Sequence, residues 1–166
     1  MLYQELFNLG GSYSDYVNQG SDEEIQALAK IDQQLLSLTP TLKQRISELN
    51  MDVHLLVAGD MWCPDCRLNI AALNHITKLQ AKVKMSIMPK VLAEDKMLAL
   101  LDMKEIKIPA VAILSDDFQL RSLFIERPMV VANHNNFDEI KDSYFAGHYL
   151  NDTISEILDK LCSETH

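Results

Sequence analysis

Residues 59–68 read GDMWCPDCRL, and the two cysteines of this stretch, Cys63 and Cys66, decide how the rest of the chain is interpreted. Two cysteines separated by two residues can close into a disulfide or bind a soft metal. The segments on either side of the pair distinguish between these two kinds of site.

The cysteine pair lies between a predicted strand and a predicted helix. Residues 53–58, VHLLVA, form an apolar run that is typical of a strand buried on both faces. From residue 64 to residue 79, apolar side chains recur on one stripe of a helix. Cys63 therefore occupies a helix N-terminus, where unpaired backbone N–H groups and the helix dipole favour a thiolate.

The segments that follow predict an α/β fold. Residues 83–88 read as a second strand, so the strand, helix and strand form a right-handed unit with parallel strands. Further predicted elements are a helix at about 93–103, a strand at 110–114, a turn at 115–117, an antiparallel strand at 119–125, and helices at 137–145 and 152–161. Asn151 or Asp152 is available as the cap of the last helix.

The first fifty residues have a helical pattern. Ser21 and Glu24 have the spacing of a capping box, which predicts a helix from about 22 to 37. Thr39 and Pro40 start a second, short helix. The residues before Ser21 have no clear period. We expect residues 1–50 to be a helical extension packed on the domain formed by residues 51–166.

Composition restricts the class of protein. A chain of 166 residues is about one domain, and its net charge of −9 disfavours nucleic acid and anionic membranes as partners. The N-terminus has no signal-peptide pattern, and no apolar run is long enough to span a membrane. Three cysteines are too few for a disulfide framework. We therefore expect a cytoplasmic protein.

The motif Trp62-Cys63-Pro64-Asp65-Cys66, followed by Ile108-Pro109 at the start of a strand, resembles thioredoxin-fold proteins. The resemblance covers about residues 53–161 and implies a central mixed β-sheet flanked by helices, with the N-terminal helices as an addition. No Gly-Gly pair follows the strand at 110–114, so the glutathione site of the similar glutaredoxins is not expected.

The predicted activity is thiol–disulfide exchange. Cys63 is the expected nucleophile, and Cys66, one helical turn further on, is expected to resolve the mixed disulfide. The redox-active disulfide needs no further cofactor. The expected partners are disulfide-containing proteins and a recycling enzyme of the thioredoxin-reductase type. Two alternatives remain: an interaction module that keeps the fold without activity, and a metal-binding domain that uses the cysteine pair.

The loop supplies candidates for docking and for pKa tuning. Trp62 is expected to contact substrates, and Met61 to extend that surface. The resemblance implies that Ile108-Pro109 is a cis peptide facing Cys63, where it would bind an extended substrate segment.

Asp60, Pro64, Asp65 and Arg67 are the expected tuning residues, although the charged ones can equally be solvated charges at a helix start. Asp65 is expected to raise the pKa of Cys63, with Arg67 opposing part of that effect, and so to make the pair reducing. Thioredoxins usually place a buried aspartate where this chain has Val57, which leaves water, Asp60 or Asp65 to assist Cys66.

A zinc site needs two ligands beyond the cysteine pair. The spacing along the helix puts His75 on the opposite face from Cys66, and His54 lies too far down the preceding strand. Of the remaining histidines, His134, His148 and His166, the first two stay open as ligands if their segments fold back on the site. Cys162 is expected to be a buried or half-buried thiol at the end of the last helix.

Overall fold

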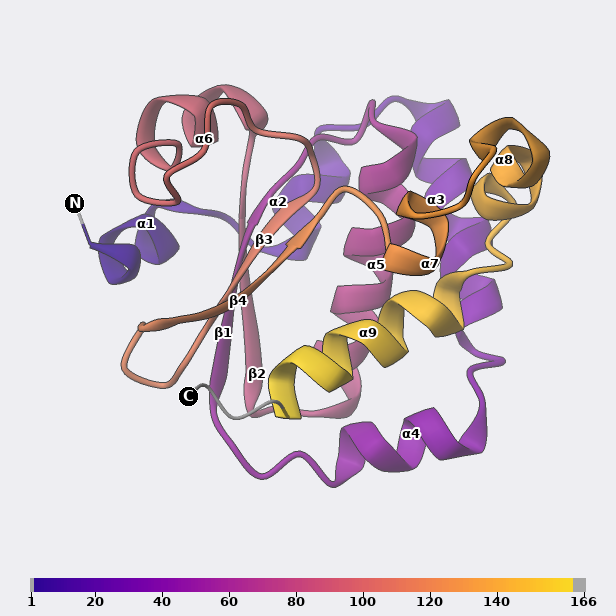
Figure 1. Ribbon diagram of the computed structural model, residues 1–166, viewed down its shortest axis with the longest axis horizontal. Helices are drawn as coiled ribbons and strands as arrows, with labels where there is room; N and C mark the ends of the chain where they lie inside the picture. Colours follow the sequence, from indigo (N-terminus) through magenta and orange to yellow (C-terminus); the bar gives the residue numbers. More distant parts are fainter. Residues whose placement is uncertain (1, 163–166) are drawn as a thin grey trace.

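Strands β1 (Val53–Ala58), β2 (Val83–Met88), β3 (Ala110–Leu114) and β4 (Leu120–Ile125) form one sheet in the computed structural model, which describes residues 2–162 (Figure 1). The order across the sheet is β2-β1-β3-β4. β1 is parallel to β2 and antiparallel to β3, and β3 is antiparallel to β4. The mixed sheet and the α/β class predicted from the sequence are confirmed.

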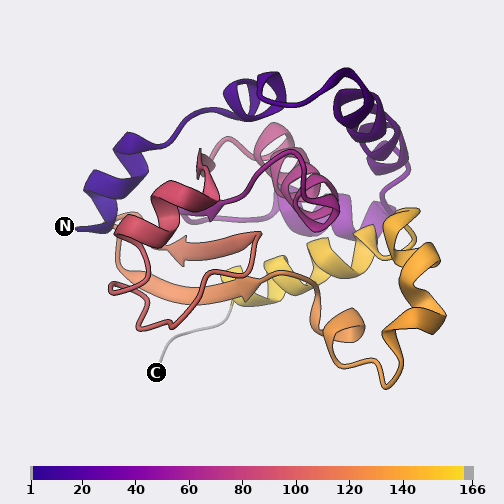
Figure 2. The ribbon, with the colours of Figure 1, turned by 90° about the horizontal axis from the view of Figure 1, so that it is seen from above.

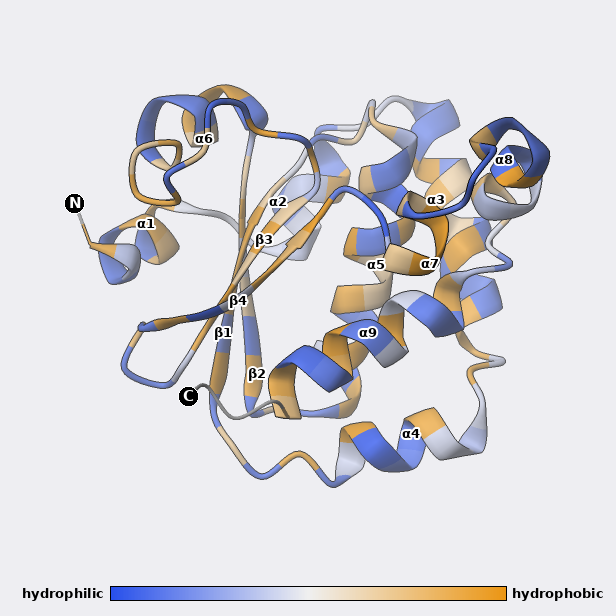
Figure 3. Ribbon diagram, in the orientation of Figure 1, coloured by the Kyte–Doolittle hydropathy of each residue, from blue (hydrophilic) through white to orange (hydrophobic). Residues whose placement is uncertain are grey.

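The two central strands carry the core. Every residue of β1 and β3 is buried, as expected for strands covered on both faces, and both strands are mostly apolar (Figure 3). Helices α5 (Pro64–Leu79) and α9 (Leu150–Cys162) pack against each other beside the sheet. Helices α1 (Tyr3–Leu9) and α6 (Lys90–Lys96) lie at the other side of the view in Figure 1.

The N-terminal residues form helices α1, α2 (Tyr13–Asn18), α3 (Asp22–Leu35) and α4 (Pro40–Ser47). In Figure 2, the first three of these helices run in an arc along one side of the molecule. The sequence predicted α3 and α4. It missed α1 and α2, because helices of 7 and 6 residues are too short to show a period. Ser12 and Asp15 start α2 with a capping box, and Ser21 and Glu24 start α3 in the same way.

The extension also covers the β2 edge of the sheet. The N–H of Gly11 donates to the Ile87 carbonyl at 2.8 Å, and the N–H of Ile87 donates to the Gly11 carbonyl at 2.9 Å. The two backbones can approach this closely because Gly10 has no Cβ. A Cβ at that position would collide with the Ser86 hydroxyl. That hydroxyl donates to the Phe7 carbonyl at 2.6 Å. These contacts protect an edge that would otherwise expose unpaired backbone groups.

Two predicted boundaries were wrong, and one short helix was missed. The helix expected at about 93–103 is α6, which starts after Pro89 and ends at Lys96, because Met97 and Leu101 enter the core from turns. α9 begins at Leu150, so Asn151 and Asp152 lie inside its first turn instead of capping it. The sequence also missed α7 (Met129–Ala132), which precedes α8 (Phe137–Phe145).

Within the described residues, no helix has the length and apolar character that a membrane crossing requires.

Candidate active site

The two cysteines meet at the first turn of α5. Cys63 is the N-cap of that helix, and the backbone N–H of Cys66 donates to its Sγ at 3.4 Å. Pro64 occupies the first helical position, where no N–H is needed. Both thiols are free; 6% of Cys63 is exposed and Cys66 is completely buried. The strand-to-helix position predicted for the pair is confirmed.

The two thiols differ in acidity. The hydrogen bond from the Cys66 thiol lowers the pKa of Cys63, and the backbone N–H of Cys66 lowers it further, against the opposing effects of burial and of the Asp65 charge. Burial raises the pKa of Cys66, and the interaction with Cys63 adds to that effect. Cys63 therefore ionises first, and Cys66 holds its proton.

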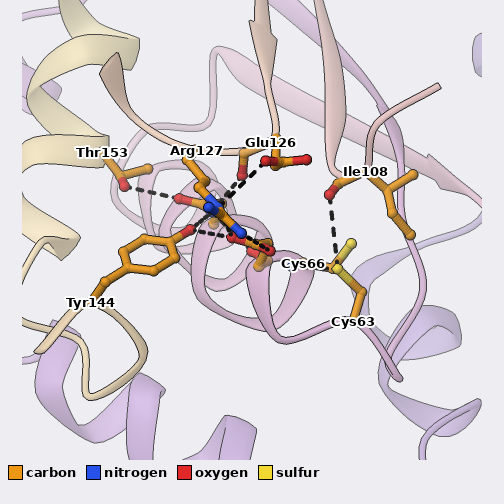
Figure 4. Close-up of polar contacts among 9 residues, drawn as sticks. Cys63, Cys66, Ile108, Glu126, Arg127, Tyr144 and Thr153 are labelled. Carbon is orange, nitrogen blue, oxygen red and sulfur yellow. Dashed lines mark hydrogen bonds and ion pairs between the residues drawn. The ribbon is translucent and has the colours of Figure 1, made fainter. Parts of the chain in front are cut away.

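The Ile108-Pro109 segment faces Cys63, as Figure 4 shows. The Cys63 Sγ lies 3.8 Å from the carbonyl oxygen of Ile108, the acceptor of the thiol proton, although 45 residues separate them. The peptide bond between Ile108 and Pro109 is cis, as expected. The Pro109 carbonyl in turn accepts a hydrogen bond from the N–H of Glu126 at 2.7 Å. This bond ties the end of β4 to the loop beside the thiols.

Asp65 is buried in a network with Arg127 and Tyr144, the two side chains labelled near the thiols in Figure 4. One of its carboxylate oxygens accepts from Arg127 Nε at 2.9 Å and from the Tyr144 hydroxyl at 2.7 Å. The guanidinium of Arg127 stacks 3.9 Å from the centre of the Phe137 ring. Burial works to lower the pKa of Arg127, but the hydrogen bond and charge of Asp65 raise it overall.

Asn69 connects this network to three other elements. Its Nδ2 lies 2.9 Å from the Asp65 carbonyl, 3.1 Å from the Glu126 carbonyl and 3.0 Å from the Tyr144 hydroxyl. Its Oδ1 accepts from the Thr153 hydroxyl on α9 at 2.9 Å. The first turns of α5 are thus fixed by the Glu126 carbonyl, just after β4, and by side chains of α8 and α9.

The predicted tuning residues have different surroundings. Asp65 is buried in an ion pair, so its interpretation as a solvated charge at a helix start was wrong. The cation beside it is Arg127; Arg67, which was expected to oppose Asp65, donates to the Met61 carbonyl at 2.6 Å instead. The net pKa of Cys63 is lowered, although Asp65 raises it as expected, because the hydrogen bonds from Cys66 outweigh that charge.

Asp60 lies against Cys66. Its backbone lowers the pKa of the Cys66 thiol and its charge raises it, while its Oδ2 accepts from the Lys90 N–H at 3.3 Å. Val57, at the position where a buried aspartate was considered, is fully buried in β1. Asp60 is therefore the carboxylate that acts on Cys66 from the loop before the pair.

Only one of the two predicted docking side chains is exposed. Trp62 has 60% of its surface exposed, whereas Met61 has 2% and cannot extend a docking surface. The Met61 side chain points toward the N-terminal extension, where a Cβ on Gly20 would come to 2.7 Å from the Met61 Cε. The burial of Met61 could not be predicted from the sequence, because its contact is with a segment that shows no helical or strand periodicity.

No group of three or more His, Cys, Asp or Glu side chains in residues 2–162 is arranged to hold a metal ion. His54 is buried and stacks 4.0 Å from Phe118, while His134 and His148 contact neighbours in their own segments. His166 lies outside the described residues. Cys162 ends α9 as an exposed thiol, so its predicted burial was wrong.

Sequence reasoning missed Arg127, Tyr144 and Asn69. Asn69 follows Asp65 by four residues, which puts both on one helix face and was the one available signal. Arg127 and Tyr144 lie 62 and 79 residues from Asp65, and no local pattern pairs positions that far apart.

A family model described as Thioredoxin matches residues 10–139. Among solved structures, a protein of unknown function from Pseudomonas aeruginosa is 36% identical, with a TM-score of 0.92 and coverage of 97% of each chain. An HIV epitope scaffold is 34% identical, with a TM-score of 0.93 over 99% of this chain and 100% of the scaffold. No curated protein matches the chain.

Proposed function

Because this chain belongs to the thioredoxin family, we propose that it is a thiol–disulfide oxidoreductase with Cys63 and Cys66 as its redox-active pair. The observation that supports the proposal is the asymmetry of the two thiols. The pKa of Cys63 at the helix N-terminus is lowered by hydrogen bonds from Cys66, whereas burial raises the pKa of Cys66. A nucleophile and a resolving thiol need this difference.

The reaction proceeds by two exchanges. The Cys63 thiolate attacks one sulfur of a substrate disulfide, a bond forms between the two sulfurs, and the other substrate sulfur leaves as a thiolate that takes up a proton. Cys66 then loses its proton and attacks Cys63, so that the bond to the substrate breaks. The second substrate sulfur leaves with the bonding electron pair. The substrate disulfide is reduced, and the Cys63–Cys66 disulfide is formed.

The surroundings of Cys63 suit a protein substrate. The Ile108 carbonyl lies above Cys63 and the Trp62 ring is exposed beside it, so an extended segment can contact both groups. Our proposal includes disulfide-containing proteins as substrates and an enzyme of the thioredoxin-reductase type that returns the pair to its reduced form. The redox-active disulfide serves as the only cofactor, and the cytoplasm is the proposed compartment.

The pair is proposed to work as a reductant, because burial and the Asp65 charge offset part of the lowering of the Cys63 pKa by the hydrogen bonds from Cys66. A less stabilised thiolate makes the reduced form a stronger reductant, so we expect a potential nearer about −270 mV than about −120 mV.

Reversible oxidation tests the proposal. In a Cys162→Ser background, titration should find two free thiols before mild oxidation, none after it, and two again after dithiothreitol. The reduced protein should also reduce the disulfides of insulin. Two thiols that persist under oxidant and become protected by added zinc would support the metal-binding alternative and contradict the proposal. Thiols that oxidise reversibly without reducing any protein disulfide would contradict the proposed substrate class.

A further inference from the structure

A pocket of about 270 Å³ begins one residue away from the nucleophile. It lies between α3 of the N-terminal extension, the first turns of α5 and the end of α8, three helices that lie together at the right of Figure 1. Pro64, which directly follows Cys63, lines the pocket together with Arg67 and Leu68 from the next turn. Because consecutive Cα atoms are about 3.8 Å apart, a substrate held on Cys63 passes close to this pocket.

The extension builds one wall of the pocket and ties it to the opposite wall. The Gln34 side chain on α3 donates from Nε2 to the Ala146 carbonyl, just after α8, at 2.7 Å. The approach requires Gly147 beside it, because that residue has a φ of +91° and a Cβ there would collide with the Gln34 amide. Helix α3 also packs against α5. The pocket therefore exists only because the extension covers this side of the dithiol helix.

The charges around the pocket are all positive. Lys30 lines it from α3 and Arg67 from α5, and none of the described residues that line it is an aspartate or a glutamate. Neither cation forms an ion pair within residues 2–162. The whole chain has the opposite balance, with 24 acidic residues against 15 basic ones. The pocket is thus a local site for an anion on an acidic protein.

Arg67 is oriented before any ligand binds. Its Nη1 donates to the Met61 carbonyl at 2.6 Å, which holds the guanidinium against the loop that carries Cys63. A guanidinium has five N–H donors in a fixed plane, so further donors remain to bind a carboxylate. Leu68 and the half-buried Phe145 add apolar walls to the pocket. A carboxylate at the end of one or two methylene groups, as in aspartate or glutamate, fits this combination of charge and apolar surface.

We propose that this pocket binds an acidic side chain of the substrate protein through Lys30 and Arg67, and so selects disulfides that have an aspartate or glutamate near the attacked cysteine. The inference rests on the proposed oxidoreductase function and adds no step to the two exchanges. An extended segment advances about 3.3 Å per residue, so we expect the acidic residue within about three positions of the substrate cysteine. Its binding holds the substrate sulfur in position for attack by Cys63.

The test measures the reduction of disulfide peptides in a single turnover by the pre-reduced protein, in a Cys162→Ser background. Two peptides are identical except that the three residues on each side of the cysteine are all Glu in one and all Gln in the other. The readout is the ratio of the two rate constants, divided by the same ratio for dithiothreitol. This ratio cancels changes in the reactivity of Cys63 and effects of the Glu residues on the peptide disulfide itself.

Each protein is first titrated with dithiobis(nitrobenzoate), so that rates refer to active dithiol. This reagent releases one coloured thiolate when Cys63 attacks, which is the first phase, and a second when Cys66 resolves the mixed disulfide.

We expect the parent to prefer the Glu peptide about fivefold, against the repulsion of its own net charge, since an exposed ion pair contributes up to about that factor. Lys30→Gln should lower the preference about twofold, and Lys30→Glu should reverse it in favour of the Gln peptide. Arg67→Gln should abolish the preference, whereas Arg67→Lys, which keeps the charge, should retain part of it.

Lys82→Gln is the matched control. Lys82 is an exposed cation just before β2, and it lies at the opposite end of the sheet from the cysteine turn because β1 and β2 are parallel. Its loss changes the net charge by the same amount as the loss of Lys30, and the fivefold preference should remain.

Equal rates for the Glu and Gln peptides in the parent would overturn the inference and leave the proposed function intact. A preference that survives in both Lys30→Glu and Arg67→Gln would also overturn it. So would an equal loss of preference in Lys82→Gln, because the net charge and not the pocket would then be responsible. Release of a single coloured thiolate by the parent, or no reduction of either peptide, would instead contradict the proposed function itself, and the inference with it.

Discussion

Asp65, between the two cysteines of the active-site turn, is held by Arg127, which lies 62 residues further along the chain and places its Nε 2.9 Å from the carboxylate. The pair is mostly buried, with 12% of the Asp65 side chain and 22% of the Arg127 side chain exposed. A negative charge next to the nucleophilic thiol is thus compensated by a cation that follows the edge strand β4. The acidity of Cys63 depends on both residues.

Replacing Asp65 with Asn should lower the pKa of Cys63. The Asp65 charge raises that pKa, and its removal also leaves the Arg127 cation unopposed near the thiolate. A charge about 7 Å from the thiolate, under partial solvent screening, shifts the pKa of the thiol by about one unit. The rate of Cys63 alkylation against pH, measured in a Cys162→Ser background, should therefore have a lower midpoint in Asp65→Asn than in its parent. A higher midpoint would contradict the electrostatic account.

Replacing Arg127 with Gln should destabilise the fold. The substitution removes the cation that donates two hydrogen bonds to the buried Asp65 carboxylate, and we expect a loss of about 2 kcal/mol in the free energy of unfolding by urea. Arg45→Gln is the matched control, because its pair with Asp159 is more exposed, at 33% and 69% of the two side chains. That control should cost about 0.5 kcal/mol or less. Equal losses in the two variants would show that the Asp65 network contributes no special stability.

Replacing Trp62 with Ala should weaken the reduction of protein disulfides. The ring is 60% exposed beside Cys63, so its loss removes a contact for the substrate without opening a cavity. We expect KM for insulin to rise about tenfold, while the first phase with dithiobis(nitrobenzoate) stays within about twofold. Leu36→Ala removes a similarly exposed apolar side chain, 65% exposed, at the end of α3. If both variants lower insulin reduction equally, Trp62 has no specific docking role.

Local patterns were enough to predict the sheet and the cysteine turn. The buried run at 53–58, the helical stripe at 64–79 and the alternation at 119–125 each lie within one element, and the structure has a strand, a helix and a strand at those positions. Chain order and handedness rules then limit how such elements can be connected. The position of Cys63 at the helix N-terminus follows from the same local signals.

The site beyond the cysteine turn was much less predictable. Arg127 and Tyr144 reach Asp65 through tertiary packing, and nothing in the sequence near either residue indicates that partner. Met61 was wrongly assigned to the surface. It is covered by Gly20 of the N-terminal extension, and nothing in the sequence indicates that the extension packs over it.

The central claim is that Cys63 attacks and Cys66 resolves, and counting the thiolates released from dithiobis(nitrobenzoate) tests it most directly. In a Cys162→Ser background, the parent should release two coloured thiolates per protein and form the Cys63–Cys66 disulfide. Cys66→Ser should release one and retain a mixed disulfide on Cys63, which mass spectrometry of its peptides identifies. Cys63→Ser should react at least about a hundredfold more slowly, because the remaining thiol is completely buried and burial raises its pKa. A rapid release from Cys63→Ser, together with a slow one from Cys66→Ser, would reverse the two roles and contradict the account.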